Sequence, residues 1–133
     1  MKVSVNFDST EFDCRNGEKY PKDWIKPRLL PLCRQLEKIR ALTGQPIKII
    51  SGYRTKAYNA KIKGAAKASQ HIEGIAADIM LKGMTALQLY KAICKLIADG
   101  VILEGGCGLY NTHCHYDIRS KKARWNKSKW KLG

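Results

Sequence analysis

The chain has 133 residues, of which 44% are hydrophobic, and this suits one compact domain rather than two separate cores or a disordered protein. It carries 25 Lys and Arg against 11 Asp and Glu, a formal net charge of +14, which favours a polyanionic partner such as nucleic acid or a bacterial wall polymer. No apolar stretch approaches the roughly 20 residues that a membrane-spanning helix needs, so we expect no membrane span.

The cysteines and the N-terminal residues bear on where the protein acts. The number of cysteines is odd and no C-x-x-C pair occurs, which predicts neither a disulfide framework nor a cysteine-rich zinc site. The first residues have neither the apolar segment nor the cleavage site of a signal peptide. We therefore expect synthesis in the cytoplasm without an export signal, so that action at a cell wall would follow release or transport within a virion.

The first part of the chain predicts a capped turn, a long helix and a strand. Asp8 and Glu11 have the spacing of a capping box. Across residues 22–42 apolar residues recur every three or four positions, as in an amphipathic helix, and two prolines near its start place the regular part after them. Residues 47–53 are rich in β-branched side chains and predict a strand.

The middle of the chain continues this mixture of elements. Residues 55–62 predict a short helix, and residues 64–70, which are small and polar, predict a loop. Residues 76–81 predict a second strand that is buried by its composition. Thr85 and Gln88 form a capping box for another amphipathic helix, which we expect to end at the next glycine.

The last part predicts two strands, at residues 101–104 and 113–119, separated by a glycine-rich turn at residues 105–108. Residues 120–133 form a basic tail with interleaved tryptophans. This tail is either a binding segment for a polyanion or a solvated end whose Trp125 caps the core.

The whole pattern predicts one domain over residues 1–133. Internal repeats and low-complexity linkers are absent. Strands and helices alternate irregularly, which favours an α+β fold over a wound parallel sheet. We therefore expect a small antiparallel sheet with flanking helices.

All three histidines lie in two short segments. His71 is followed seven residues later by Asp78, and small residues surround both, which fits a close approach of the backbone to a site. His113, His115 and Asp117 alternate along a predicted strand and so share one face. Isolated histidines are more often surface or core residues, but two on one strand face are harder to explain by chance. Because zinc in hydrolases usually has three N or O ligands and one open position, His71, Asp78 and one histidine of the pair are a candidate zinc site.

These residues also resemble a known family, the M15 zinc metallopeptidases, over essentially the whole chain. The matching positions are Phe7, Glu11, Phe12, Cys14, Gly17, Ser51-Gly52-Tyr53-Arg54-Thr55, Ser69, His71, Gly74, Ala76, Asp78, Gly108-Leu109-Tyr110, His115-Tyr116-Asp117-Ile118-Arg119 and Ala123-Arg124-Trp125. The early positions are similar to the D-Ala-D-Ala carboxypeptidase subgroup. The family also includes dipeptidases of vancomycin resistance and phage L-Ala-D-Glu endolysins, and hedgehog signalling domains share its fold. The resemblance implies a hedgehog/DD-peptidase fold.

The resemblance implies roles for individual residues. By this likeness His71, Asp78 and His115 are the ligands of Zn2+. Arg54 binds the scissile carbonyl oxygen or the substrate carboxylate, and His113 helps to stabilise the oxyanion, where one donor is commonly worth about 3 kcal/mol. The residues implied to contact the substrate are Ser69 and Tyr53.

One position departs from the family pattern. Many members have an acidic general base three residues before the last ligand, and here that residue is Thr112. Glu104 is our candidate substitute, although an exposed carboxylate at a strand end is the plainer reading, and Glu73 and Asp117 are weaker candidates. Asp117 is also placed to orient His115 or Arg54.

Three functions follow from these observations. The first is a zinc peptidase of the D-Ala-D-Ala carboxypeptidase or endopeptidase type that hydrolyses stem or cross-link peptides of peptidoglycan, encoded by a phage or prophage. The second is a non-catalytic zinc module of the same fold that binds the wall or belongs to a virion. The third, a nucleic-acid-binding protein, has the charge in its favour but no helix-turn-helix or zinc-finger spacing. Peptidoglycan peptides and anionic wall polymers are thus the expected partners.

Overall fold

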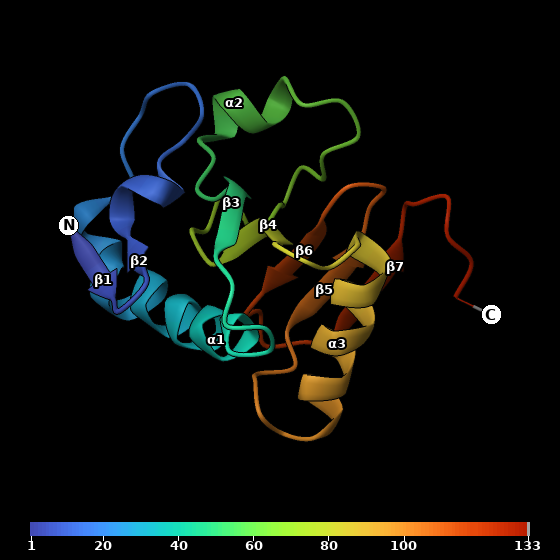
Figure 1. Cartoon of the computed structure of the whole chain (residues 1–133). Helices are drawn as coiled ribbons and strands as arrows, with labels where there is room; N and C mark the ends of the chain where they lie inside the picture. Colours follow the sequence, from blue (N-terminus) through green and yellow to red (C-terminus); the bar gives the residue numbers. More distant parts are fainter. Residues whose placement is uncertain (133) are drawn as a thin grey trace.

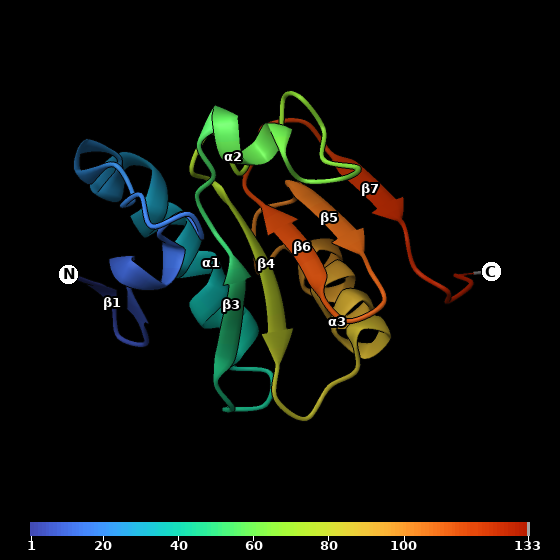
Figure 2. The same cartoon turned by 90° about the horizontal axis from the view of Figure 1, so that it is seen from above.

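The computed structural model describes residues 1–132, and a five-stranded sheet lies at its centre (Figures 1 and 2). In spatial order the strands are β3 (Ile47–Ser51), β4 (Ala76–Leu81), β6 (Cys114–Asp117), β5 (Gly106–Leu109) and β7 (Ala123–Asn126). Neighbouring strands are antiparallel except β5 and β7, which run parallel. The predicted α+β fold is confirmed, but the sheet is mixed rather than purely antiparallel.

Helices lie on both faces of this sheet. The α-helices are α1 (Leu30–Arg40), α2 (Lys56–Ala60) and α3 (Ala86–Ala98). The shorter elements are β1 (Lys2–Ser4), β2 (Phe7–Asp8), the 3-10 turns η1 (Ser9–Phe12) and η2 (Lys22–Trp24), and the π-helical turn η3 (Ile25–Leu29). Helices α1 and α3 cover one face of the sheet, whereas α2 and the loop after it lie over the other (Figures 1 and 2).

Strand alternation separates the core from the functional face. Ile79 of β4 and Tyr116 of β6 are fully buried on the face that α1 and α3 cover. Because successive side chains of a strand point to opposite faces, Asp78 and His115 point to the face beneath α2. The core is completed by side chains with at most 1% exposure, among them Phe12, Leu29, Leu32, Leu36, Ile39, Leu89, Ile93 and Leu109.

Elements with strong local signals form where the sequence predicts them. Strand β4 has the predicted bounds, and Thr85 and Gln88 make the predicted capping box of α3. Asp8 and Glu11 cap η1 in the same reciprocal way. Within the segment predicted as a helix over 22–42, the 3-10 turn η2 and the π-helical turn η3 come before α1. The regular helix thus begins near the prolines, as expected, because proline supplies no backbone N–H and its ring crowds the preceding turn.

The glycine-rich segment near residue 105 is where the prediction is wrong. Residues 101–104 are not a strand, and the predicted turn at 105–108 contains most of β5, whose residues are all buried. A Cβ atom on Gly106 would overlap the Asp117 carboxylate, and one on Gly108 would overlap the Trp125 indole ring. The role of these two glycines is therefore to leave room for neighbouring side chains within a strand, and not to form a turn.

The predicted basic tail also contains a strand. Strand β7 pairs with β5 so that Gly108 lies opposite Trp125, and the chain that follows β7 extends beyond the sheet (Figure 2). Trp125 thus belongs to the folded domain, while the last predicted tail residue, Gly133, lies outside the described residues. The short segment after β6 passes the end of β5, so that β7 pairs with the edge of β5 that β6 leaves free. Strand β7 therefore runs parallel to β5.

Among the described helices, none has both the length and the apolar composition needed to cross a membrane.

Candidate metal centre

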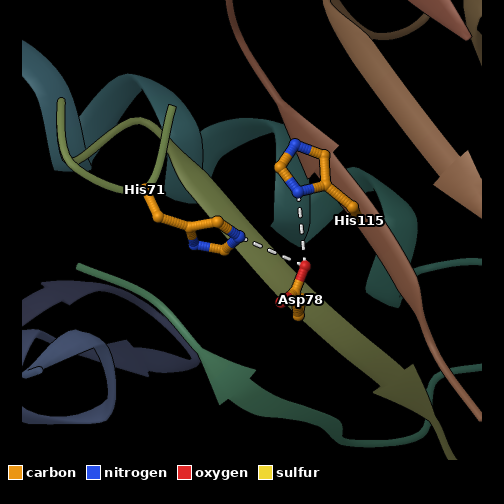
Figure 3. A group of neighbouring side chains, drawn as sticks. All are labelled: His71, Asp78 and His115. Atoms are coloured by element: carbon orange, nitrogen blue, oxygen red, sulfur yellow. Dashed lines mark hydrogen bonds and ion pairs between the residues drawn. The ribbon is translucent and has the colours of Figure 1, made fainter. Parts of the chain in front are cut away.

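Three buried side chains that can bind a metal come together on the face beneath α2. His71, Asp78 and His115 each offer one ligand atom, and these atoms all lie within 4.8 Å of one another. Figure 3 shows the two imidazole rings approaching the same carboxylate oxygen from different directions. The ring centroids of the two histidines are 5.0 Å apart. The predicted ligand set therefore meets in space.

Strand pairing and one turn position these residues. Asp78 of β4 and His115 of β6 are directly opposite in the antiparallel register, so their side chains are neighbours on one face. His71 lies in the turn before β4, where its backbone N–H donates to Ser69 Oγ at 3.2 Å. Gly74 closes this turn with a φ of +72°, and a Cβ atom there would meet the Tyr20 hydroxyl. The turn therefore needs glycine both for its backbone and for its packing.

The far nitrogen of each imidazole is already engaged by a hydrogen bond. His71 Nδ1 lies 2.7 Å from the Gly52 carbonyl oxygen, which can only accept, so this nitrogen carries the proton. His115 Nε2 likewise lies 2.6 Å from Asp117 Oδ2. The near nitrogens, His71 Nε2 and His115 Nδ1, each lie 3.3 Å from Asp78 Oδ1. Neutral imidazoles in these tautomers direct two lone pairs and a carboxylate at one point, which is the arrangement that a cation needs.

The pKa values of these side chains reflect the same contacts. Burial would raise the pKa of Asp78, but contacts with His115 and His71 outweigh it and hold that pKa well below its usual value. Burial lowers the pKa of His71. Burial also opposes charge on His115, but its contacts with Asp117 and Asp78 outweigh burial and raise the pKa of His115. A proton on His115 would therefore compete with a metal ion for the same ring nitrogen.

Asp117 fixes the orientation of His115 from the next layer. Its side chain is fully buried and accepts hydrogen bonds from the Gly106 backbone N–H at 3.0 Å and from Arg119 Nη2 at 2.7 Å. Burial would raise the pKa of Asp117, but the contacts with His115 and Arg119 lower it. Asp117 contacts His115 rather than Arg54, so it is a positioning residue and stays ionised.

Arg54 is bound tightly beside the ligands. Its guanidinium donates to Asp78 Oδ2 at 3.1 Å, to Ser51 Oγ at 3.1 Å and to Asn59 Oδ1 at 3.3 Å. Asp78 therefore contacts the imidazoles through one oxygen and Arg54 through the other. The guanidinium adds positive charge to the wall of the cleft within reach of a bound substrate.

Two cavities beside the cluster share part of their lining. The smaller has a volume of about 270 Å³ and the larger about 470 Å³. Residues that line both are Arg54, Gly64, Ala65, Asp78, Tyr110 and Lys127. His71 and His115 line the smaller cavity, and His113 lines the larger. Asp78 is thus the member of the cluster that lines both cavities.

Two of the other residues predicted from the sequence lie in this cleft. Ser69 lines the smaller cavity. His113 is half-buried in the wall of the larger one, where its ring stacks on Tyr110 at a centroid distance of 4.7 Å. Its Nδ1 lies 3.1 Å from Thr112 Oγ1, and burial lowers its pKa, so the imidazole is neutral at neutral pH. His113 is thus placed to offer a hydrogen bond rather than a positive charge.

The structure does not bring Tyr53 or Glu104 to the cleft. The backbone N–H of Tyr53 donates to the Phe12 carbonyl at 2.9 Å, and its ring makes edge contacts with Tyr20 and Trp24. Glu104 precedes β5, four residues before the glycine that lies opposite His115, and it lines a separate cavity with Lys122 and Arg124.

The weaker candidates for a general base are also occupied elsewhere. Glu73 is exposed and pairs with Arg28 at 3.6 Å, and Asp117 is bound by His115 and Arg119. In the described part of the chain, Asp78 is the one carboxylate that lines either cavity beside the cluster.

The C-terminal segment supplies residues that the sequence did not predict for the site. Trp125 lies 4.9 Å from His115 between ring centroids, and its Nε1 donates to the Tyr110 hydroxyl at 3.0 Å. Lys127 and Arg119 also line the smaller cavity. Apolar and polar residues alternate over residues 123–126, which is a weak signal for a strand. The many basic residues around this segment made a solvated tail the more obvious interpretation.

Comparison with known proteins gives a family match and several similar relatives. The family described as Peptidase M15 matches residues 5–117. Proteins named peptidoglycan L,D-endopeptidase MepK, from Escherichia coli (strain K12), Escherichia coli O157:H7 and Shigella flexneri, are 36% identical over 73 residues, which cover 50% of this chain and 40% of theirs. The chain thus aligns with less than half of the length of these relatives. The family match includes all three ligand candidates and most of the sheet, and the chain belongs to the Peptidase M15 family.

Proposed function

We propose that this protein is a zinc-dependent endopeptidase that cleaves peptides of peptidoglycan at the cell wall. The observation that carries the proposal is the convergence of two oriented imidazole nitrogens and one carboxylate oxygen in an open cleft. Membership of the Peptidase M15 family supports peptide hydrolysis, and the relatives named as peptidoglycan endopeptidases support the substrate class.

The residues present fit a zinc ion. His71 Nε2, His115 Nδ1 and Asp78 Oδ1 would hold it, which is the three-ligand N and O set of catalytic zinc sites. Bound zinc would supply a Lewis acid and lower the pKa of a water molecule to about 7. Arg54 would bind the carbonyl oxygen of the substrate, Ser69 would contact the bound peptide, and Asp117 would hold the His115 ring in position.

The cleft favours an endopeptidase over a carboxypeptidase. A carboxypeptidase needs a closed pocket beyond the scissile bond, because its substrate ends there. Here Arg54, Asp78 and Tyr110 line both cavities beside the cluster, so neither cavity ends in a wall of its own at these residues. This shared lining supports a substrate that extends beyond the scissile bond.

A second candidate function is a non-catalytic zinc module that binds wall peptides. It is favoured by Thr112, which stands where many relatives have an acidic base, and by the lack of a second carboxylate among the described residues that line the two cavities. A general base typically contributes roughly 100- to 10,000-fold to the rate, so its absence would leave binding with little hydrolysis.

One experiment separates the two candidates. The purified protein is assayed for metal and then incubated with intact peptidoglycan sacculi, and released fragments are analysed by mass spectrometry. For the endopeptidase we expect about one zinc per chain and new ends at internal peptide bonds, both lost in His115→Ala. Zinc without new ends would support the binding module, whereas a protein that binds no zinc would contradict both. Release of only single terminal residues would contradict an endopeptidase.

A further inference from the structure

The larger cavity beside the metal centre has an unusual distribution of charge. It is formed by the end of β3, the segment that follows α2, and the residues before β6 and after β7. The charged residues that line it are Arg15, Arg54, Lys63, Lys127 and Asp78. Four cations thus face one carboxylate, and that carboxylate already contacts both imidazoles and Arg54.

The two arginines of this cavity are bound to the protein. Arg15 donates hydrogen bonds to the backbone carbonyl oxygens of residues 11, 13, 49 and 50. Arg54 is held by Asp78, Ser51 and Asn59. Both therefore contribute a fixed positive charge to the wall, but most of their N–H groups already have acceptors.

The two lysines, in contrast, have no protein partner for their ammonium groups. Within residues 1–132 neither Lys63 nor Lys127 takes part in an ion pair or a side-chain hydrogen bond. The backbone N–H of Lys127 donates to the Leu109 carbonyl at 2.8 Å, which fixes the lysine at the end of β7. Both lysines are exposed and far apart in sequence, and both line this cavity together with Asp78.

We propose that this cavity is a subsite for a free carboxylate of the substrate, bound by Lys63 and Lys127. The inference rests on the proposed function for the identity of the substrate and narrows it to peptides that carry an ionised carboxyl group beside the scissile bond. A carboxylate would give both lysines the partner that they lack and would form charge-assisted hydrogen bonds. An amide at the same position would form only weaker hydrogen bonds without the opposite charge.

The same positive cavity would also accept a phosphate group of an anionic wall polymer. Geometry favours the carboxylate, because Lys127 and Asp78 line both cavities and a group bound there is continuous with a peptide at the metal centre. A phosphate polymer would have no reason to lie along that peptide path.

The test compares two peptides that differ in one group. One member of the pair is a peptidoglycan stem peptide, and in the other member a single carboxyl group is converted to a carboxamide. A separate pair is made for each carboxyl group of the peptide. Binding to the zinc-loaded full chain is measured by calorimetry, so the test works whether or not the peptide is cleaved. For the carboxyl group next to the scissile bond we expect amidation to weaken binding about tenfold.

Lysine variants identify the subsite. The double variant Lys63→Gln and Lys127→Gln is expected to bind the acid and the amide equally and to keep its zinc. Lys129→Gln is the matched control, because Lys129 lies against Trp130 and lines neither cavity, and it should discriminate like the unchanged protein.

Three results would overturn the inference. The first is equal binding of every acid and amide pair by the unchanged protein, and the second is discrimination that survives in the double variant. The third is inorganic phosphate binding that depends on the two lysines while acid and amide peptides do not differ. Failure of the proposed function appears separately, as undigested sacculi in a protein that still discriminates between the peptides.

Discussion

At the scale of single residues, the site depends on which nitrogen of each histidine carries a proton. Gly52 and Asp117 accept from the far nitrogens of His71 and His115, so both near nitrogens direct a lone pair at Asp78. One of these acceptors is a neutral carbonyl and the other is a buried carboxylate. The two ligands therefore differ in basicity although they have the same chemistry.

Removing the charge of Asp117 should weaken metal binding. In Asp117→Asn the amide can still accept from His115, but it no longer supports a positive imidazole or neutralises Arg119. We expect zinc affinity to fall about 10- to 100-fold, measured by competition with a chromophoric chelator. Asp99→Asn is the control, because Asp99 is exposed and contacts Lys95 far from the site. Equal affinities for the two variants would refute the role of Asp117.

The raised pKa of His115 predicts how zinc binding depends on pH. Burial opposes the positive charge, yet Asp117 and Asp78 raise the pKa of this histidine above the ordinary value of about 6.5. A protonated His115 cannot bind zinc, so affinity should fall as the pH is lowered, by about tenfold per pH unit below that pKa. The fall should begin above pH 6.5, and calorimetry in two buffers would detect the proton released on binding. In Asp117→Asn it should begin at lower pH, and the same onset in both proteins would contradict the assignment.

At the scale of elements, β5 connects the core to the metal centre. Gly106 leaves room for the Asp117 carboxylate, and Gly108 leaves room for the Trp125 ring, which lies against His115. Strand β7 then holds Tyr110 through the Trp125 indole N–H. A segment that looks like a loop by composition thus determines the position of two walls of the cleft.

Adding a methyl group to β5 should disturb this arrangement. Gly108→Ala places a Cβ atom where the Trp125 ring now lies, so we expect a loss of about 1–3 kcal/mol in the free energy of unfolding, measured with urea. A double-mutant cycle with Trp125→Ala is the control. In the Trp125→Ala background the added methyl group meets no ring and should cost much less. Additive losses would mean that the overlap with Trp125 is not the cause.

At the scale of the whole molecule, the net charge of +14 acts at longer range than any single contact. Cations from separate segments line the two cavities, among them Lys63, Lys127 and Arg119. Screening shortens electrostatic attraction to a Debye length of about 10 Å at 0.1 M salt. The charge should therefore concentrate the protein on an anionic wall before any peptide enters the cleft.

Wall binding should accordingly weaken with salt while the metal site does not. We expect the fraction of protein that co-sediments with sacculi to fall several-fold between about 0.05 and 0.5 M NaCl, with the zinc content unchanged. His115→Ala keeps the surface cations and should show the same salt dependence without any cleavage. Sedimentation that is independent of salt would show that charge does not drive the association.

The sequence by itself determined the elements whose signals are local. The apolar composition of β4, the reciprocal cap of α3 and the short spacing of His71 and Asp78 are properties of nearby residues, and each could be predicted without knowing the rest of the chain. The family resemblance selected His115 as the third ligand, because its motifs occur in order along the sequence, with the exception of Thr112.

The tertiary structure alone decided how distant segments meet. Glycine favours turns locally, so β5 became visible only where Asp117 and Trp125 fill the space beside its two glycines. Lysine and arginine suggest a solvated tail, so β7 became visible only through its pairing with the edge of β5. The same pairing brings Trp125 and Lys127 into the cleft, while Glu104 stays outside it. The position of a side chain in a site depends on contacts between segments that are far apart in sequence. A local sequence pattern cannot predict these contacts.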